Sequence, residues 1–374
     1  MDYDLRYYKG RKIDTHSYDG FVLSGDVGGT NTNLGVSGIH DSNPKLLFSL
    51  HFQSQALRSL SPAVKEVLRL AKEKHDINVS SACIAAAGPV SDERDYCTLT
   101  NVKWNVDARA LLKKTPLESL FIINDFEAIG YGINLLDPKN EKDIVVLRHG
   151  KRPAKKTLAT KAVIGAGTGF GKCILVYDPD FGIYVPVASE GGHADFPAQD
   201  EEELALIEYI QKKRKNRNPV SYEDVLSGRG IEAIYGFLRS GGKFKQTRFT
   251  REIDACATKC KEFGMKSRLI SKYRTRDKTC EAAFRMYTDF YARTAKDFVL
   301  DSLAKGGVYI AGGIASRNPD IFKARRFISE FENANKQRDI LKDTPIYIVV
   351  NYNVSLYGAG LAALKRHDLA IMAK

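Results

Sequence analysis

Gly25-Asp26-Val27-Gly28-Gly29-Thr30-Asn31-Thr32-Asn33 is the glycine-rich stretch from which the rest of the chain can be interpreted. The apolar run Phe21-Val22-Leu23 precedes it and the alternating residues Leu34-Gly35-Val36 follow it, so it predicts a tight turn between two strands. A P-loop or a dinucleotide-binding motif would begin a helix after its glycines instead. Glycines let backbone N–H groups approach an anion, and Asp26 stands where a carboxylate can hold Mg²⁺ through water. The hypothesis is a phosphate-cradling hairpin, but for one such turn alone an ordinary tight hairpin is the better interpretation.

A second stretch repeats this pattern. Residues 162–171, Ala-Val-Ile-Gly-Ala-Gly-Thr-Gly-Phe-Gly, place a turn rich in glycine and threonine after an apolar strand, and the apolar run Cys173-Ile174-Leu175-Val176 follows. A repeated signal is harder to explain as chance turn chemistry than a single one. Two such hairpins predict two related halves that hold a polyphosphate from both sides.

Composition and charge limit the classes of protein. The chain has 374 residues, of which 43% are hydrophobic, so two domains with sizeable cores are expected. No stretch is long and apolar enough to span a bilayer, and the N-terminus lacks the apolar segment of a signal peptide. Six scattered cysteines indicate reduced thiols and a cytoplasmic protein. The net charge of +12 suits an anionic ligand such as a nucleotide. The basic clusters lack interleaved stacking aromatics, so no specific nucleic-acid binding is expected.

Strands and helices alternate after the first hairpin. Residues 83–87 and 120–123 are predicted to be buried strands. The strand–helix–strand order predicts a mainly parallel sheet covered by helices. Ligand sites in such sheets gather at the carboxyl ends of the strands, which is where Asn124 and Asp125 stand. In the second half, residues 308–311 form a strand that runs into Gly312-Gly313.

Two helices near the C-terminus have recognisable packing patterns. Phe284, Tyr287, Tyr291, Ala295 and Phe298 lie at helical spacing, and this stripe is interpreted as core. The predicted helix over 356–364 contains Gly358 and Gly360, small residues that allow either close packing or hinging. The predicted organisation is a mobile arm over 1–20, a small α/β domain of 21–135 plus 352–374, and a large α/β domain of 136–351.

Six motifs in this order resemble the bacterial-type glucokinases of the hexokinase/actin/Hsp70 superfamily, and they extend from Gly25 to Leu364. They are the two glycine-rich turns and the segments Ile123-Asn124-Asp125-Phe126, Glu190-Gly191-Gly192-His193, Glu223 with Val225-Leu226-Ser227-Gly228, and Ile310-Ala311-Gly312-Gly313-Ile314. The resemblance implies a two-domain actin-like (ribonuclease H-like) α/β fold. Each domain would be a mixed sheet flanked by helices, with a cleft between them that closes on the sugar.

The resemblance also implies roles for individual residues. Asp125 is implied as the catalytic base, since a carboxylate within reach of a sugar hydroxyl can accept its proton. From the residues alone, an N-cap role for Asp125 is an equally good interpretation. The implied sugar contacts are Asn101, Asn124, Asp125, Glu190, His193 and Glu223. The alternative for the segment Glu190 to His193 is a surface turn. The alternative for Glu223 is a charged residue in the first turn of a helix. The implied ATP contacts are Asp26, Gly28, Gly29, Thr30, Asn31, Gly167, Thr168, Gly169, Gly312 and Gly313. Lys172, next to the second turn, is expected to be solvated.

The expected activity is that of a glucokinase, which transfers the γ-phosphate of ATP to the 6-hydroxyl of glucose with Mg²⁺ held by Asp26 through water. The expected cofactors are ATP and Mg²⁺, the partners are glucose and ATP, and the family allows a homodimer. Alternatives are a kinase for another hexose, an amino sugar or another phosphoryl donor. From another class, a non-catalytic sugar sensor and an actin-like assembling ATPase remain open, although neither needs a base beside a sugar.

Overall fold

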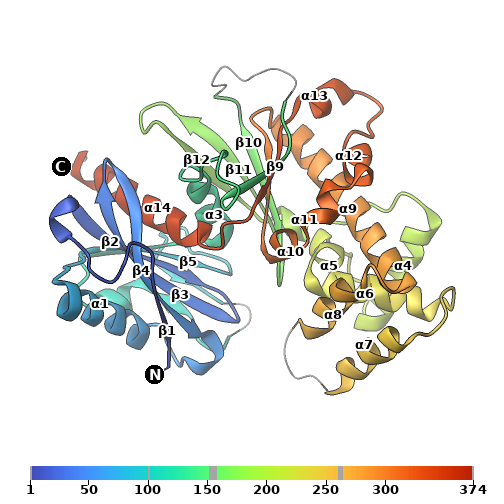
Figure 1. Cartoon of the computed structure of the whole chain (residues 1–374), viewed down its shortest axis with the longest axis horizontal. Coiled ribbons are helices and arrows are strands. Elements are labelled where there is room, and N and C mark those ends of the chain that lie inside the picture. Colours follow the sequence, from blue (N-terminus) through green and yellow to red (C-terminus); the bar gives the residue numbers. More distant parts are fainter. Residues whose placement is uncertain (1, 100–101, 151–157, 260–263, 373–374) are drawn as a thin grey trace. The chain divides into compact units, whose positions relative to one another are not determined.

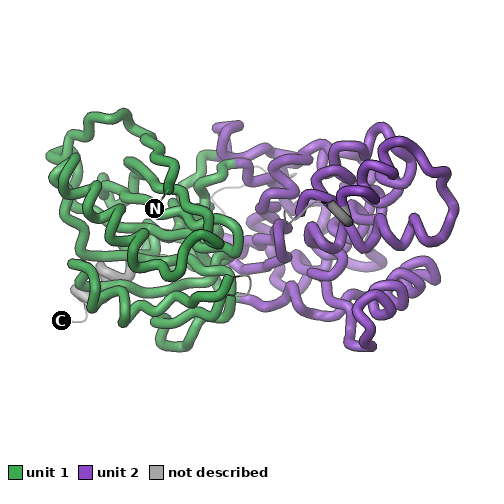
Figure 2. Tube along the Cα trace, turned by 90° about the horizontal axis from the view of Figure 1, so that it is seen from below, with its two compact units in different colours: residues 1–137, 177–188, 351–374 green, residues 138–176, 189–350 purple. Residues whose placement is uncertain are grey.

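The computed structural model describes residues 2–99, 102–150, 158–259 and 264–372, and these divide into two compact units. Unit 1 comprises residues 1–137, 177–188 and 351–374, and unit 2 comprises residues 138–176 and 189–350 (Figure 2). The domains predicted from the sequence differ from these units mainly in residues 177–188, which were placed in the second domain.

Unit 1 is built on a six-stranded mixed sheet (Figure 1). The strand order is β1 (Asp4–Tyr7), β4 (Asn43–Gln53), β3 (Asn31–His40), β2 (Gly20–Val27), β5 (Ser81–Ala86) and β8 (Ser119–Asn124). The first four strands are antiparallel neighbours, whereas β2, β5 and β8 run parallel. A small two-stranded sheet pairs β6 (Tyr96–Cys97) with β7 (Val106–Asp107).

Helices cover both faces of this sheet, as the sequence predicted. The prediction of a mainly parallel sheet is wrong, because β1, β4, β3 and β2 pair antiparallel and only β2, β5 and β8 are parallel. Side chains alternate between the faces along β2, so Leu23 packs in the core that includes α1 (Ser61–His75) and α2 (Ala108–Leu112). Val22 packs in a second core with residues of α3 (Asp125–Ile133) and α14 (Val354–Met372). The short helices η1 (Thr15–Ser17) and η2 (Ser54–Ala56) complete the unit.

Glycines let α3 and α14 pack closely. A Cβ on Gly358 would lie 1.7 Å from the carbonyl oxygen of Ala128, and one on Gly132 would lie 2.1 Å from the carbonyl oxygen of Val354. No side chain fits at such distances. Of the two roles that the sequence left open for Gly358, the structure supports close packing.

The N-terminal segment differs from the predicted mobile arm. Residues 4–7 form β1, which pairs antiparallel with β4 at the edge of the sheet. Tyr3, Leu5 and Tyr7 alternate along the strand and pack against the core on the α1 side. The Tyr3 hydroxyl also donates to Glu66 Oε1 of α1 at 2.9 Å. Alternate apolar side chains therefore attach this segment to the unit.

The second sheet has the strand order β12 (Ile183–Ser189), β11 (Phe170–Asp178), β10 (Lys161–Ala166), β13 (Val308–Ala311), β14 (Ile346–Val349) and β9 (Ile144–Arg148). Its strands belong to unit 2, except that the end of β11 and most of β12 fall in residues 177–188 of unit 1. Strands β10, β13 and β14 are parallel, and β11 and β9 are antiparallel to their neighbours. The helices are α4 (Glu201–Arg214), α5 (Tyr222–Leu226), α6 (Gly228–Ser240), α7 (Arg248–Lys259), α8 (Met265–Tyr273), α9 (Lys278–Ser302), α10 (Gly313–Arg317), α11 (Pro319–Lys323), α12 (Arg325–Phe331) and α13 (Arg338–Asp343), with η3 (Gly191–His193).

Helix α9 supplies much of the unit 2 core. The five residues of its predicted core stripe are all buried, which confirms that interpretation: Phe284, Tyr287, Tyr291, Ala295 and Phe298. Their neighbours come from the sheet and from several helices, and include Phe170, Tyr235 and Phe322. Such a core fixes β10 and β11 against the helices that follow them in the chain.

The two sheets share one arrangement. In each, an antiparallel hairpin is followed by two parallel strands: β3-β2-β5-β8 in unit 1 and β11-β10-β13-β14 in unit 2. The duplicated halves that the two glycine-rich stretches predicted are therefore present. No helix within the described residues combines the length and the apolar composition needed to cross a bilayer. Five cysteines in these residues are buried: Cys83, Cys97, Cys173, Cys256 and Cys280.

Candidate active site

The first glycine-rich turn connects β2 and β3, as the sequence predicted. The Gly28 N–H donates to the carbonyl oxygen of Asn31 at 2.9 Å and closes the turn. Ser54 Oγ donates to the Gly28 carbonyl at 2.7 Å, and Gln55 Nε2 donates to the Gly29 carbonyl at 3.1 Å. The segment of η2 therefore fixes the backbone of this turn, a support that the local sequence pattern does not reveal.

The outer side of this turn is open. The side chains of Thr30 and Asn31 are exposed, and a Cβ on Gly28 would meet only the Asn31 carbonyl oxygen, at 3.5 Å. The buried Trp104 donates from Nε1 to the Ser54 carbonyl at 3.2 Å, which links η2 to the core. Hydroxyl, amide and backbone donors are thus available at a rigid turn, which suits phosphate oxygens.

Asp26 lies in β2, two residues before Gly28. Burial raises the pKa of Asp26 to about 6, and a hydrogen bond from the Asn33 side chain opposes that rise. The carboxyl is therefore ionised at pH 7, although its surroundings disfavour the charge. Within the described residues, no three His, Cys, Asp or Glu side chains gather to hold a metal. A single desolvated carboxylate fits Mg²⁺, which keeps several waters and takes other ligands from phosphates.

The parallel strands bring Asp26 and Asp125 to one edge of the unit 1 sheet. Val27 pairs with Ala86 of β5, and Ala86 pairs with Asn124 of β8. Neighbouring strands are about 4.8 Å apart, so the first turn and the start of α3 are separated by roughly 10 Å. The carboxyl ends of β2, β5 and β8 therefore hold a phosphate-type turn and an aspartate together, as expected for a ligand-binding edge.

Asn124, rather than Asp125, caps helix α3. Asn124 Oδ1 accepts from the Phe126 N–H at 2.8 Å, and Glu127 Oε2 accepts from the Asn124 N–H at 2.9 Å, which forms a capping box. Arg94 Nη2 lies 2.9 Å from Glu127 Oε1 and holds that carboxylate. Asp125 is the first helical residue, half-buried at the positive end of α3, and accepts from the Phe126 N–H at 3.0 Å. The N-cap interpretation of Asp125 thus loses its support.

The second glycine-rich turn joins β10 and β11 in unit 2. Its backbone is closed by the Gly167 N–H, which donates to the Gly169 carbonyl at 2.8 Å. The Gly167 carbonyl accepts from the Gly228 N–H at 3.0 Å, so α6 begins against the turn. A Cβ on Gly167 would meet nothing within 4 Å, and the Thr168 side chain is exposed. This turn, like the first, offers open backbone and hydroxyl donors.

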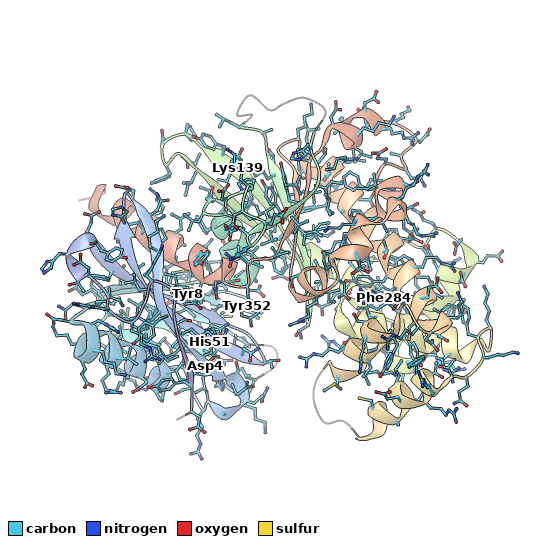
Figure 3. The ribbon with its side chains drawn as sticks, viewed as in Figure 1. Asp4, Tyr8, His51, Lys139, Phe284 and Tyr352 are labelled. Carbon is cyan, nitrogen blue, oxygen red and sulfur yellow. The ribbon has the colours of Figure 1, made fainter. Side chains whose placement is uncertain are left out.

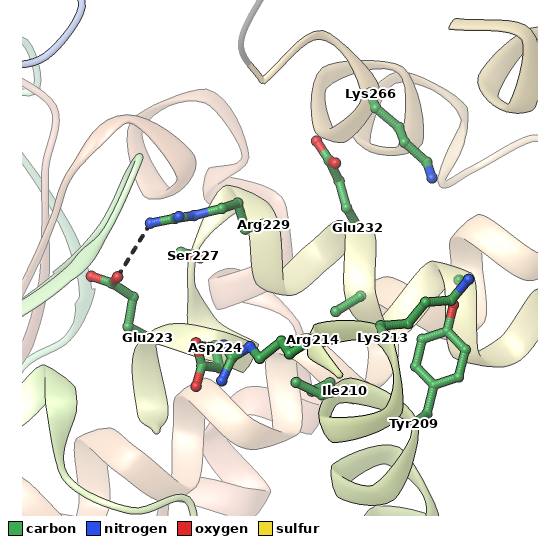
Figure 4. Close-up of a pocket in the computed structure, with 12 residues that line it drawn as sticks. Tyr209, Ile210, Lys213, Arg214, Glu223, Asp224, Ser227, Arg229, Glu232 and Lys266 are labelled. Carbon is green, nitrogen blue, oxygen red and sulfur yellow. Dashed lines mark hydrogen bonds and ion pairs between the residues drawn. The ribbon is translucent and has the colours of Figure 1, made fainter. Parts of the chain in front are cut away.

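Glu223 lies against this second turn. Its Oε2 accepts from the Phe170 N–H at 3.1 Å, and a Cβ on Gly169 would lie 2.5 Å from that oxygen. Its Oε1 lies 3.4 Å from Arg229 Nη2 of α6, on one side of a pocket of about 450 Å³ lined by α4, α5, α6 and α8 (Figure 4). Glu223 is therefore fixed by a strand N–H and a guanidinium, beyond its role in the first turn of α5.

The segment from Glu190 to His193 packs on the other side of Phe170. A Cβ on Gly192 would lie 1.9 Å from the Phe170 carbonyl oxygen, so only glycine allows this approach. The side chains of Glu190 and His193 are exposed, with His193 Nε2 3.7 Å from Glu190 Oε2. Unit 2 thus brings three predicted sugar contacts, Glu190, His193 and Glu223, around the start of β11. Asn101 lies outside the described residues.

Lys172 was expected to be solvated, and this prediction is wrong. Only 7% of Lys172 is exposed, and its Nζ lies 4.1 Å from the ring centroid of Tyr222. Burial lowers its pKa, while Asp301 and Asp297 oppose that fall. Its side chain also lies beside Gly191, where a Cβ would be 3.2 Å from Lys172 Cδ. Lys172 therefore lies between the predicted sugar-binding segments that contain Gly191 and Glu223. Its place in an otherwise apolar strand was the sequence signal that it is buried.

The glycine pair after β13 lies beside the second turn. Gly312 has a φ of 89°, which side chains rarely adopt, and a Cβ there would lie 2.4 Å from the Ala166 carbonyl oxygen. Gly165 pairs with Ala311 in the parallel register of β10 and β13, so both segments leave the same edge of the sheet. Gly313 begins α10. The predicted adenosine segment and the second phosphate-type turn are therefore neighbours in unit 2.

Comparisons with known proteins identify the family of the chain. A glucokinase family model matches residues 23–366. A glucokinase of Nostoc sp. is 33% identical over 351 residues, which cover 92% of this chain and 99% of the relative. A crystal structure of a glucokinase from an Antarctic psychrotroph has a TM-score of 0.72 and 25% identity, covering 92% of this chain and 99% of that one.

A ROK family glucokinase from Streptomyces griseus, solved in complex with glucose and AMPPNP, shares the fold. Its TM-score is 0.57 at 16% identity, covering 92% of this chain and all of that one. The family model, the Nostoc relative and the solved structures each span nearly the whole chain. The chain therefore belongs to the glucokinase family.

Proposed function

We propose that this protein transfers the γ-phosphoryl group of ATP to the 6-hydroxyl of glucose. Membership of the glucokinase family supports the reaction. The structural observation that carries the proposal is the placement of Asp125 and the Asp26 turn at one edge of the unit 1 sheet. Phosphoryl transfer needs alignment and charge neutralisation more than covalent catalysis, and these residues are of the required types.

In this proposal Asp125 is the general base. Its carboxylate accepts the proton of the 6-hydroxyl as the oxygen attacks the γ-phosphorus, and the bond to the ADP oxygen breaks. Because Asn124 performs the capping of α3, the Asp125 carboxylate is not required as the helix cap. General base catalysis of this kind contributes about 10²- to 10⁴-fold to a rate.

The two glycine-rich turns are proposed to hold the phosphates of ATP. In unit 1, Gly28 shapes the turn, the donors are the Gly29 N–H with the side chains of Thr30 and Asn31, and Asp26 would hold Mg²⁺ through water. When bound, Mg²⁺ neutralises phosphate charge. The donors in unit 2 are the turn from Gly167 to Gly169, including Thr168. Gly312 and Gly313 would leave room for adenosine. The AMPPNP complex of the Streptomyces protein supports ATP as the donor.

Sugar recognition is assigned to Glu190, His193 and Glu223 in unit 2 and to Asn124 and Asp125 in unit 1. Carboxylates and amides that are held in place accept and donate hydrogen bonds to particular hydroxyls, and a wrong epimer leaves some of them unpaired. Phe170 fixes Glu223 and contacts the Gly192 segment, which supports this assignment within unit 2. Asn101 stays a prediction, as do cytoplasmic localisation, a place in glycolysis and a homodimer.

A coupled assay tests the proposal. Purified protein is supplied with glucose, other hexoses and amino sugars, and with ATP or other phosphoryl donors, in the presence and absence of Mg²⁺. The expected result is glucose 6-phosphate formation that requires ATP and Mg²⁺. Glucose binding without turnover under every donor would contradict the kinase proposal and favour a sugar sensor.

A further inference from the structure

Three polar residues lie side by side across three strands of the unit 1 sheet. Asp26 of β2 pairs with Asn33 of β3, and Asn33 pairs with His51 of β4. His51 Nδ1 lies 2.6 Å from Asn33 Oδ1, and the Asn33 side chain hydrogen-bonds to Asp26. Asn33 is only 5% exposed, so its amide must find its partners within the protein.

The chemistry of these groups fixes the direction of the hydrogen bonds. Ionised Asp26 only accepts, so Asn33 donates to it from its amide nitrogen and presents Oδ1 to His51. His51 must then donate from Nδ1, which leaves Nε2 to accept. Ser49 Oγ lies 2.8 Å from Nε2 and is the donor there. Burial and Arg6 lower the pKa of His51, in agreement with a neutral ring.

The row continues to the N-terminal segment. The Tyr8 hydroxyl lies 3.0 Å from Ser49 Oγ and 3.2 Å from Asn353 Oδ1, directly before α14. Tyr8 and His51 are labelled in Figure 3. Tyr8 follows β1, and its N–H donates to the Leu47 carbonyl of β4 at 2.9 Å. Because the Ser49 hydroxyl proton is used at His51 Nε2, the one hydroxyl proton of Tyr8 must go to Ser49 Oγ, and Asn353 Oδ1 then only lies nearby. With this assignment a chain of hydrogen bonds connects Asp26 to Tyr8. We call Asn33, His51, Ser49 and Tyr8 the polar row.

The opposite face of the same strands provides a comparison. Tyr7 donates to or accepts from His75 Nε2 at 3.2 Å, and both rings pack against Phe48. That Tyr–His pair lies on the α1 side of the sheet, the opposite face from Asp26. A pair of this kind explains how β1 is attached to the unit, but it does not explain the row of polar groups that ends at Asp26.

We propose that His51 is a positioning residue for the nucleotide site, and that Tyr8 completes its support. His51 orients the Asn33 amide, and Asn33 holds the Asp26 carboxylate in the rotamer that faces the hydrated Mg²⁺ of MgATP. This inference rests on the proposed function for the identity of the ligand. Residues that orient a metal-binding group commonly change metal affinity or activity by about 10- to 100-fold when removed.

The experiment compares binding of ATP by isothermal titration calorimetry, once with Mg²⁺ and once with EDTA. His51→Ala should weaken MgATP binding about tenfold and leave metal-free ATP and glucose binding unchanged. Tyr8→Phe should produce a smaller loss in the same direction. His75→Ala and Tyr7→Phe are the matched controls on the other face and should bind MgATP as the wild type does. His51→Asn retains an N–H donor near the Nδ1 position and should recover most of the affinity.

A double-mutant cycle tests whether His51 acts through Asn33. In the Asn33→Leu background, His51→Ala should cause no further loss of MgATP affinity. Additive losses would overturn the inference, and so would equal losses for MgATP, metal-free ATP and glucose. Equal affinity of the wild-type protein for ATP with and without Mg²⁺ would contradict the proposed role of Asp26 in holding Mg²⁺, and with it this inference. Glucose turnover by the wild type is measured separately, so failure of the proposed function is recognised independently of these binding results.

Discussion

Replacing Asp26 by Asn should abolish turnover and yet make unit 1 more stable. Burial raises the pKa of Asp26 from its ordinary value of 3.8 to about 6. Each pKa unit corresponds to about 1.4 kcal/mol, so the ionised carboxylate lowers the free energy of unfolding at pH 7 by at most about 3 kcal/mol. Because Asp26 is partly exposed, screening by solvent reduces the expected gain for Asp26→Asn to about 2 kcal/mol.

The sign of the pH dependence follows from the raised pKa. Between pH 4 and 6 the folded protein binds this proton more tightly than the unfolded chain does. The destabilisation by Asp26 is therefore complete above about pH 6 and disappears as the pH falls toward 4. The advantage of Asp26→Asn over the wild type should shrink across the same range.

Urea unfolding measures this effect in the absence of Mg²⁺ and ATP. Trp104 is the only tryptophan of the chain and is buried in unit 1, so its fluorescence reports the unit that contains Asp26. Asp107→Asn is the control, because Asp107 caps α2 and asparagine caps a helix equally well. No gain at pH 7, or a gain that persists undiminished at pH 4, would refute the reasoning.

Two further substitutions test packing in each unit. Gly358→Ala should lower the free energy of unfolding by about 3 kcal/mol, because its Cβ would lie 1.7 Å from the Ala128 carbonyl oxygen. Gly360→Ala is the control on the same helix, because a Cβ there would meet only side-chain atoms, the nearest at 3.3 Å. Both variants are unfolded in urea and followed by Trp104 fluorescence. Equal stability of the two would contradict this account. Lys172→Met should change thermal stability by less than about 1.5 kcal/mol, because a buried ammonium over Tyr222 is replaced by an apolar chain of similar volume. A loss much larger than this in calorimetry would show that the charge itself is required.

Much of the fold could be predicted because its signals are local. Each glycine-rich turn has apolar strand residues on both sides, and the hydrophobic runs reveal the strands that end at Asn124 and Ala311. The placement of Asp26 and Asp125 at one edge then follows from the parallel strand order. That these two aspartates lie near each other could be anticipated, because the carboxyl ends of parallel strands meet at one edge of the sheet.

Other features depend on partners distant in the sequence. The strand β1 is four residues long, and its apolar side chains, Leu5 and Tyr7, gain their neighbours only from β4 and α1. The apolar strand around Lys172 is a local sign of burial, but it does not identify Tyr222 and Phe298 as the rings that surround the ammonium. No local pattern identifies contacts that depend on the assembled sheet.

The caps and supports of the site show the same limit. From the sequence, Asp125 was as good an N-cap as a base. The structure separates the two roles because Asn124 is the N-cap and forms the capping box with Glu127, whereas Asp125 is the first residue of the helix. The support of the first turn by Ser54 is a contact over 26 residues. A serine has no sequence signature for such a contact, so only the three-dimensional arrangement reveals it.

The turnover of Asp125→Asn, measured together with its affinity for glucose, tests the central claim most directly. Asparagine keeps the shape and one acceptor oxygen of the side chain but cannot take up the hydroxyl proton. The account predicts that kcat falls about 10³-fold while the glucose Kd stays close to that of the wild type, and that Asp107→Asn retains full activity. A kcat for Asp125→Asn equal to that of the wild type would contradict the assignment of Asp125 as the base.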